Sequence, residues 1–455
     1  MDEVLFYNSV GDPAKKHSTS FGFVSSTRST QQVGQYRQCY SANNGTVLTG
    51  INGENKIISA CHSKALVHVY ILGKESPEQT IPVPEELICL ELCPHPNSTD
   101  AWLLVAGAVS GRIYVWELDS GLLLAVKESH YQSVSVIKYV KGYLVSGGAD
   151  SRVVVWKVLD MMSDSHKPYA IYTDHTLPVT DLLVTTGLVN DLKVWSVSRD
   201  QTIRCHDLTS QTLVTTFIAQ QPVSSITADP AYRSLYVGYE DGTIRMVNLF
   251  DAPSKTQIWE HVGGYGKVIT LKDDPELRET FVSHQAEGNS ITKLEISFDG
   301  SQLISGDSKG KVLVSDVATK QIVRTLKPLA GAVSTLKLFR IKSDSLKYAP
   351  TKSSVRGIPV LKRSLVDEPE LQRHVVFKKF EKADKAPEFN LERFLDITKS
   401  EAKWFTNFTN VDSTVKKEKE VDTAEIDRLR EANAALRQKY DELYETHSKL
   451  LMNNK

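Results

Sequence analysis

The feature that most constrains the fold is a repeated strand–turn–strand segment that ends in tryptophan. Its clearest copy is residues 144–158, LVSGGADSRVVVWKV, in which valines stand among polar and charged neighbours before Trp156. Alternation of this kind predicts a strand with one buried face. Gly147 and Gly148, just before Asp150, are predicted to provide a tight connection between two strands. The segment therefore predicts a pair of antiparallel strands.

The same pattern recurs along the chain at the spacing of one propeller blade. Residues 103–118 repeat it about 40 residues upstream, with Trp116 in place of Trp156. Four weaker copies fall in step with these two, at residues 57–72, 195–208, 235–249 and 303–317. Such repeats are typical of WD-repeat β-propellers, whose blades are four-stranded sheets. The chain is therefore predicted to be all-β, with blades one to six numbered in the order of these copies.

An unpaired opening strand predicts how the ring closes. Residues 331–339, GAVSTLKLF, resemble the strands that open the other blades, but no repeat follows them. Residues 1–45 contain strand-like pieces without a tryptophan repeat. The amino-terminal strands are therefore expected to complete the blade begun by 331–339, which gives a seven-bladed ring over residues 1–340 and protects its open edges. Whether residues 357–380 add a further strand is left open.

An insertion separates blades five and six. It covers residues 251–290 and makes this repeat much longer than one blade. It is expected to loop out of one face of the ring. Its aromatic residues, Trp259 and Tyr265, either dock a partner or pack on the ring.

Two segments are predicted beyond the ring. Residues 341–410 are expected to be an extended tail, because lysine, serine, aspartate and proline are frequent there. Large apolar residues gather at 387–408, a docking segment that packs either on the propeller or on a partner. Residues 411–455 are expected to form the α-helical coiled coil that ends the chain.

The coiled coil is predicted from a seam of residues at alternating steps of three and four, with leucine at every d position. The seam consists of Ile426, Leu429, Asn433, Leu436, Tyr440, Leu443, His447 and Leu450. Asn433 at an a position favours a parallel dimer in fixed register. The alternative is a single amphipathic helix lying on a globular surface.

Polar residues at fixed blade positions are assigned a structural role. In WD-repeat blades, an aspartate in the tight turn holds a histidine, which reaches through a serine hydroxyl toward the indole N–H. Each of these groups needs a partner once it is buried. The residues predicted for this network are His130, Ser146, Asp150 and Trp156 in blade three, His175, Ser196 and Asp200 in blade four, and Trp116 in blade two. His206 replaces the tryptophan of blade four, and weaker blades keep only Asp241 or Ser305.

The same residue types could be mistaken for a hydrolase triad, but they are spread over the loop and strand positions of a repeat. The chain has no G-x-S-x-G, P-loop, H-E-x-x-H or dinucleotide-binding sequence. Cys89 and Cys93 lack a second pair at zinc spacing, so the five cysteines are expected to be buried thiols. We therefore predict no enzyme, and no catalytic, cofactor or metal site.

The chain is expected to be soluble and intracellular. The amino terminus has no apolar stretch of signal-peptide length, and the longest apolar run, at 101–109, is too short to cross a bilayer. The formal net charge of −1 argues against binding of nucleic acid or anionic membrane through charge alone.

Three stretches resemble a known family. Residues 110–139, 174–184 and 195–208 are similar to the WD-repeat (IPI) subunit of the nucleolar complex that processes pre-rRNA of the large ribosomal subunit. The resemblance implies a non-catalytic scaffold in the nucleolus and nucleoplasm, bound to a helical-repeat subunit and a smaller subunit. It also implies recruitment of a large AAA-type ATPase to the pre-60S particle and removal of the second internal transcribed spacer. Contact with RNA would be indirect or weak, and association with chromatin is possible. Two copies of the chain would form a homodimer through the carboxyl-terminal helix.

Two other functions are considered. A substrate receptor of a ubiquitin ligase would carry Asp-Arg-like dipeptides after the tryptophan strands, whereas these strands end WEL, WKV, HDL, VNL and SDV. Direct reading of RNA by the propeller would need a basic stripe with exposed aromatic side chains.

Overall fold

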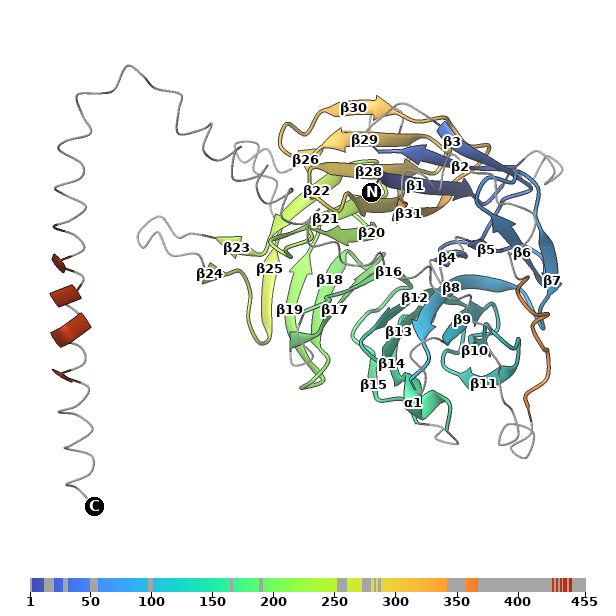
Figure 1. The fold of residues 1–455 in the computed structure, drawn as a ribbon, viewed down its shortest axis with the longest axis horizontal. Helices are drawn as coiled ribbons and strands as arrows, with labels where there is room; N and C mark the ends of the chain where they lie inside the picture. The colour runs from blue at the N-terminus through green and yellow to red at the C-terminus, as the bar shows by residue number, and fades with distance from the viewer. Residues whose placement is uncertain are drawn as a thin grey trace, which may run out of the picture. The chain divides into compact units, whose positions relative to one another are not determined.

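The computed structural model describes most of residues 2–341, a short segment at 357–366 and part of a helix near the carboxyl terminus (Figure 1). The gaps in this description are residues 12–19, 28–31, 50–55, 97–100, 164–166, 188–190, 252–259, 272–279, 282–283, 285–287, 342–356 and 367–427, and all beyond 427 except ten helical positions between Arg428 and Leu443. The chain divides into two compact units, Met1–Val376 and Phe377–Lys455.

The first unit is a ring of seven antiparallel blades, as the repeats predict. Blade one comprises β4 (Thr46–Thr49), β5 (Lys56–Ala60), β6 (Leu66–Ile71) and β7 (Gln79–Pro82). Blade two comprises β8 (Leu87–Pro94), β9 (Trp102–Ala108), β10 (Arg112–Glu117) and β11 (Leu123–Glu128). Blade three comprises β12 (Val134–Val140), β13 (Tyr143–Gly148), β14 (Val153–Lys157) and β15 (Ala170–Tyr172), with the short helix α1 (Val158–Met161) before β15.

The remaining blades follow the same order from the axis outward. Blade four comprises β16 (Val179–Val184), β17 (Lys193–Ser198), β18 (Thr202–Asp207) and β19 (Thr212–Ile218). Blade five comprises β20 (Val223–Ala228), β21 (Ser234–Tyr239), β22 (Ile244–Asn248) and β26 (Thr280–Phe281). Blade six comprises β27 (Ile291–Ile296), β28 (Gln302–Asp307), β29 (Val312–Asp316) and β30 (Ile322–Thr325). Successive strand residues are buried on opposite faces of a blade: Val154 lies in a core cluster with residues of blade two, and Val153 and Val155 lie in one with residues of blade four. The prediction of a single buried face was therefore wrong, because each blade packs between two neighbours.

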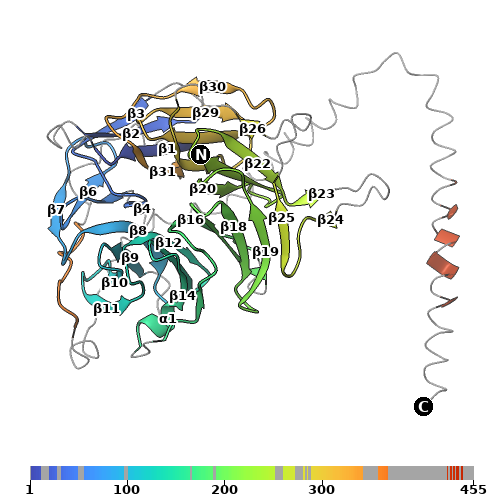
Figure 2. The same ribbon diagram turned by 180° about the vertical axis from the view of Figure 1, so that it is seen from behind.

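The ring closes through strands from both ends of the sequence. Blade seven has the order β31 (Val333–Ile341), β1 (Asp2–Ser9), β2 (Phe21–Ser26) and β3 (Gln32–Arg37). β1 pairs antiparallel with β31, with Leu5 opposite Leu338 and Tyr7 opposite Leu336. Seen from either side, the inner strands β31, β4, β8, β12, β16 and β20 surround the axis (Figure 2). The closure therefore leaves neither β1 nor β31 with an unpaired edge toward the other.

The described part of the 251–290 insertion extends the outer edge of the ring instead of looping out of a face, so that expectation was wrong for these residues. β25 (Lys267–Thr270) adds a parallel fifth strand to β19, and Leu271 is buried in the core between blades four and five. β23 (Phe250–Asp251) and β24 (Glu260–His261) form a two-stranded ribbon. Residues 251–279 of the insertion lie between β22 and β26, the third and fourth strands of blade five, which are the strands farthest from the axis of the ring. Trp259 lies outside the described residues, and Tyr265 is exposed.

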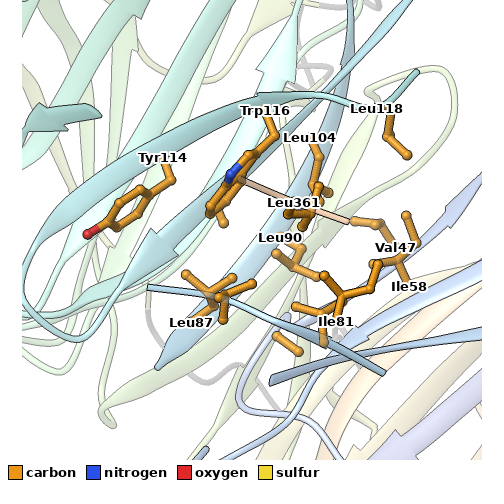
Figure 3. Close-up of a cluster of buried hydrophobic side chains, with 14 of the residues drawn as sticks. Val47, Ile58, Ile81, Leu87, Leu90, Leu104, Tyr114, Trp116, Leu118 and Leu361 are labelled. Carbon is orange, nitrogen blue, oxygen red and sulfur yellow. The ribbon is translucent and has the colours of Figure 1, made fainter. Parts of the chain in front are cut away.

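Residues 357–366, which we call the strap, lie across blades one and two. Gln79 pairs with the backbone of Ile358 through two hydrogen bonds, of 2.9 and 3.1 Å. Leu361 is 2% exposed and lies in a hydrophobic cluster with Leu90 and Leu104 (Figure 3). The strap has a single bridge to Leu123 and adds no strand to the blade. It nevertheless covers apolar surface that the two blades alone would leave exposed.

The second unit is described at a few helical positions. The ten described positions between Arg428 and Leu443 are helical, and Leu443, at a seam d position, is 69% exposed. The other seven seam residues and the docking segment at 387–408 lie outside the described residues, so the coiled coil stays a prediction. Within the part of the chain that is described, no helix combines the length and apolar character needed to cross a bilayer.

Candidate functional site

The polar network of blade three is built on the loop before β12 and the turn between β13 and β14. His130 Nδ1 lies 2.9 Å from Asp150 Oδ1, and His130 Nε2 lies 2.8 Å from Ser146 Oγ. Trp156 Nε1 donates to Ser129 Oγ at 3.0 Å, and Ser129 Oγ lies 3.4 Å from Ser146 Oγ. The histidine is therefore linked to the indole through two serines, and Ser129 is a member of the network that was not predicted from the sequence.

The protonation of this network follows from its contacts. Burial alone would raise the pKa of Asp150, but hydrogen bonds from His130 and from the Tyr131 N–H lower it below its usual value. Ser146 is fully buried and its hydroxyl also lies 3.3 Å from the Val154 carbonyl oxygen. The Ser–His–Asp order resembles a hydrolytic triad, but a substrate cannot reach Ser146 Oγ without unfolding the blade. The arrangement therefore fixes the turn against the loop.

Blade four has an equivalent network with a different aromatic partner. His175 lies 3.0 Å from Asp200 Oδ2 and 2.8 Å from Ser196 Oγ. His206, at the tryptophan position, places Nε2 2.8 Å from Asp174 Oδ2. The hydrogen bond from His206 lowers the pKa of Asp174, whereas burial lowers the pKa of His206. Asp174 directly precedes His175, as Ser129 directly precedes His130. In both blades, the residue before the network histidine therefore accepts a hydrogen bond from the aromatic side chain at the tryptophan position.

Blade six contains a third network, which sequence reasoning missed. His284 lies 3.2 Å from Asp307 Oδ2 and 2.9 Å from Ser305 Oγ. Asn289 donates a further hydrogen bond to Asp307 at 3.0 Å. The available signal was spacing, because His284 precedes Ser305 by 21 residues, as His175 precedes Ser196.

Trp116 belongs to a different contact from the one expected. Its indole Nε1 donates to the backbone oxygen of Lys362 in the strap at 2.8 Å. The structure thus brings seven of the eight predicted network residues into the networks of blades three and four, and Trp116 binds the strap instead. The reason is that Lys362 presents a carbonyl acceptor where blade three presents the Ser129 hydroxyl.

The axis of the ring carries charged side chains from five inner strands. They are Glu91, Lys138, Asp181, Lys293, Glu295 and Lys337. Lys337 Nζ lies 3.6 Å from Glu91 Oε2. Burial would lower the pKa of Lys138, but the nearby Asp181, Glu91 and Glu295 raise it, and burial raises the pKa of Glu295. Three acids and three bases balance in formal charge, so the axis is not the basic stripe that RNA reading requires.

The cysteines are buried thiols. All five are free and buried, and burial raises the pKa of Cys89 and of Cys93 to about 12. These thiols are therefore protonated at neutral pH and are poor nucleophiles and metal ligands.

Comparison with known proteins found relatives that match the chain from end to end. A pre-rRNA-processing protein IPI3 of Candida albicans is 38% identical over 99% of this chain and 99% of the relative. The protein of the same name from Scheffersomyces stipitis is 39% identical over 100% of both. That of Saccharomyces cerevisiae is 28% identical over 94% of this chain and 97% of the relative.

No protein-family model matches the chain. The seven-bladed ring accounts for the WD-type repeats, and the identity of 38–39% extends over the carboxyl-terminal unit as well as the ring. The chain therefore belongs to the IPI3 family of pre-rRNA-processing proteins.

Proposed function

We propose that this chain is a non-catalytic scaffold subunit of a nuclear complex that processes pre-rRNA. In this proposal the complex removes the second internal transcribed spacer and matures the pre-60S particle by recruiting a large AAA-type ATPase. The observation that carries the proposal is the 38–39% identity, over essentially the full length, to proteins named for pre-rRNA processing. Identity over both units argues that the whole chain performs one task.

The construction of the ring supports a scaffold role. Its polar groups with the geometry of catalytic residues, such as His130 and Ser146, are buried and bonded within the blades. Fold and function are separate questions, and a rigid ring with loops on two faces is suited to holding several proteins at once. The nuclease and ATPase activities would come from other members of the complex.

We propose that two copies pair through the carboxyl-terminal helix. The eight-residue seam has leucine at each d position and Asn433 at an a position, a combination that favours parallel dimers. Leu443 projects from the helix with 69% of its surface exposed, as a d residue does in a single helix. Pairing would double the number of ring faces in each complex.

Affinity purification of the full chain from nuclear extract tests the proposal. We expect precursor rRNA that contains the second internal transcribed spacer, pre-60S proteins and an AAA-type ATPase to co-purify. The matched control is the same preparation from cells that express the tag alone. Recovery of a ubiquitin-ligase complex without precursor rRNA would contradict the proposal and favour the substrate-receptor function.

A further inference from the structure

An arginine and a tyrosine form an exposed stacked pair on the face of the ring where the inner strands begin. The guanidinium carbon of Arg152 lies 4.5 Å from the centre of the Tyr131 ring, and Tyr131 is 79% exposed. The Tyr131 N–H donates to Asp150 Oδ2 at 3.0 Å, and the Arg152 N–H donates to Asp150 Oδ1 at 3.3 Å. The buried network of blade three therefore fixes the backbone on both sides of the pair.

Two aliphatic side chains are exposed on the neighbouring loops. Val109 is 45% exposed and Leu177 is 47% exposed. The turn that carries Val109 lies against the Tyr131 loop, because the His130 N–H donates to the Gly111 carbonyl oxygen at 3.1 Å. The start of β12 contacts the start of β16 through Ser135 Oγ, which donates to the Val179 carbonyl at 2.6 Å. Since Leu177 lies just before β16, blades two, three and four present one continuous surface.

On this face, the acidic side chains are engaged within the protein, whereas one arginine is available to a partner. Asp150 and Asp200 are bonded to buried histidines, and Glu240 pairs with Arg199. Glu85 accepts hydrogen bonds from Ser110 and Tyr114. Among the described residues, Arg152 has no carboxylate within ion-pair distance. The face therefore offers a cation that is already held flat on an aromatic ring, while its neighbouring acids are engaged.

We propose that Val109, Tyr131, Arg152 and Leu177 form a docking surface for an acidic, apolar-containing segment of a protein partner. A carboxylate of the partner would pair with Arg152, and an apolar side chain would cover Val109 and Leu177. Tyrosine and arginine are the residues most often found where a few contacts dominate an interface. This inference rests on the proposed scaffold function and assigns one of its protein contacts to a face.

The occupant is a protein and not RNA for two reasons on this surface. Aliphatic side chains flank the stacked pair, and they suit apolar partner groups but not phosphates. The chain as a whole has a formal net charge of −1, and Arg152 is the cation at the centre of the patch. Binding of a polyanion generally needs several cations along its path.

Site-specific photocrosslinking in the full chain tests the proposal. The photoreactive residue p-benzoylphenylalanine replaces Leu177, which leaves the Arg152–Tyr131 pair intact. The matched control places it at Phe298, which follows β27 and therefore lies on the opposite face. Phe298 carries the same kind of stacked pair, with the Arg340 guanidinium carbon 4.4 Å from its ring centre. Cross-linked peptides from the purified complex are identified by mass spectrometry.

We expect cross-links from position 177 to collect on one segment of one protein, rich in aspartate or glutamate with apolar residues between. Arg152→Glu should abolish them, whereas Arg340→Glu should not. A synthetic peptide of that segment should bind the full chain at least roughly tenfold more weakly after Arg152→Glu, measured by fluorescence anisotropy. Arg152→Gln, which removes the charge alone, serves as the second variant if thermal melting shows that Arg152→Glu is unfolded.

Three results would overturn the docking surface. They are cross-links from position 177 to RNA, cross-links that survive Arg152→Glu, and a cross-linked segment without acidic residues. If the chain co-purifies with pre-60S particles but position 177 gives no cross-link, the surface is wrong and the scaffold function stands. If the chain does not co-purify with pre-60S particles at all, both the scaffold function and this surface are wrong.

Discussion

Asn8 Oδ1 accepts a hydrogen bond from Ser334 Oγ at 2.9 Å, although 326 residues separate the two. Asn8 is fully buried on β1, and Ser334 lies on β31 beside it. The same oxygen accepts from Ser41 Oγ at 3.2 Å, and Asn8 Nδ2 donates to Thr46 Oγ1 at 3.1 Å. One amide side chain therefore joins both ends of the ring to the first strand of blade one.

Replacement of this asparagine should weaken the closure. Asn8→Ala leaves Thr46, Ser41 and Ser334 without a shared partner in a buried site, and we expect the free energy of unfolding to fall by about 2–4 kcal/mol. Urea denaturation measures this change. Asn248→Ala, at an exposed position at the end of β22, is the control and should change it by less than about 0.5 kcal/mol. Equal stabilities of the two variants would contradict the closing role of Asn8.

Gly121 should be needed for the strap to lie on blade two. Its φ is +73°, and a Cβ at this position would lie 2.5 Å from the Val360 carbonyl oxygen. Gly142 has a φ of +87° with no atom near its Cβ position, so Gly142→Ala reports backbone strain alone, about 1–2 kcal/mol. We expect Gly121→Ala to lower the free energy of unfolding by more than Gly142→Ala does. It should also release the strap, which would be seen as faster trypsin cleavage after Lys362 and Arg363. Equal cleavage in the two variants would show that the strap is held without this close approach.

The aspartates of the blade networks should make stability fall in acid. Burial alone would raise the pKa of Asp200, but hydrogen bonds from His175 and Thr202 lower this pKa below its usual value. The pKa values of Asp150 and Asp307 are also lowered. The folded state thus binds fewer protons, so this stabilisation is complete above the unfolded aspartate pKa of about 3.9 and is lost as the pH falls through the lower folded values.

Asp200→Asn should flatten this acid dependence. The comparison is the free energy of unfolding between pH 6 and pH 2.5, in the wild-type chain and in the variant. Asp191→Asn, in an exposed pair with Lys193, is the control and should retain the wild-type slope. An unchanged slope in Asp200→Asn would mean that the acid dependence arises elsewhere.

The blade pattern could be predicted from the sequence because it is periodic. Copies such as 144–158 recur at about the spacing of one blade, and the unpaired strand at 331–339 required a partner from the amino terminus. The strap has no such period: Leu361 packs in a hydrophobic cluster with residues of blades one and two, and the Lys362 carbonyl accepts a hydrogen bond from Trp116. A backbone carbonyl that replaces a side-chain acceptor leaves no mark in the sequence.

Site residues were predictable where the histidine precedes a recognisable strand. His130 and His175 stand before clear β12 and β16 patterns, whereas His284 lies within the 251–290 insertion, where the repeat pattern is lost. Ser129 was missed because a serine beside a histidine is common in loops. The Arg152–Tyr131 pair depends on the fold of two separate loops, so neither residue identifies it alone.

Self-association should depend on the carboxyl-terminal helix. A chain truncated at residue 410 lacks the whole seam, and we expect it to sediment as a monomer while the full chain sediments as a dimer. Leu436→Glu in the full chain places a charge at a d position and should give the same result. Glu431→Gln, at an exposed helical position outside the seam, is the control. A dimer of unchanged stability after truncation would place the interface in the ring.

The most direct measurement is spacer processing in a fungal cell whose own IPI3-family protein has been depleted and replaced by this chain. Northern hybridisation to the second internal transcribed spacer reports the outcome. We predict normal spacer removal with the wild-type chain and, wherever the protein remains folded, with Ser146→Ala, because the blade network is structural. Precursors that persist with a stable, folded Ser146→Ala chain, at wild-type protein levels, would contradict this prediction by showing that this hydroxyl takes part in the chemistry.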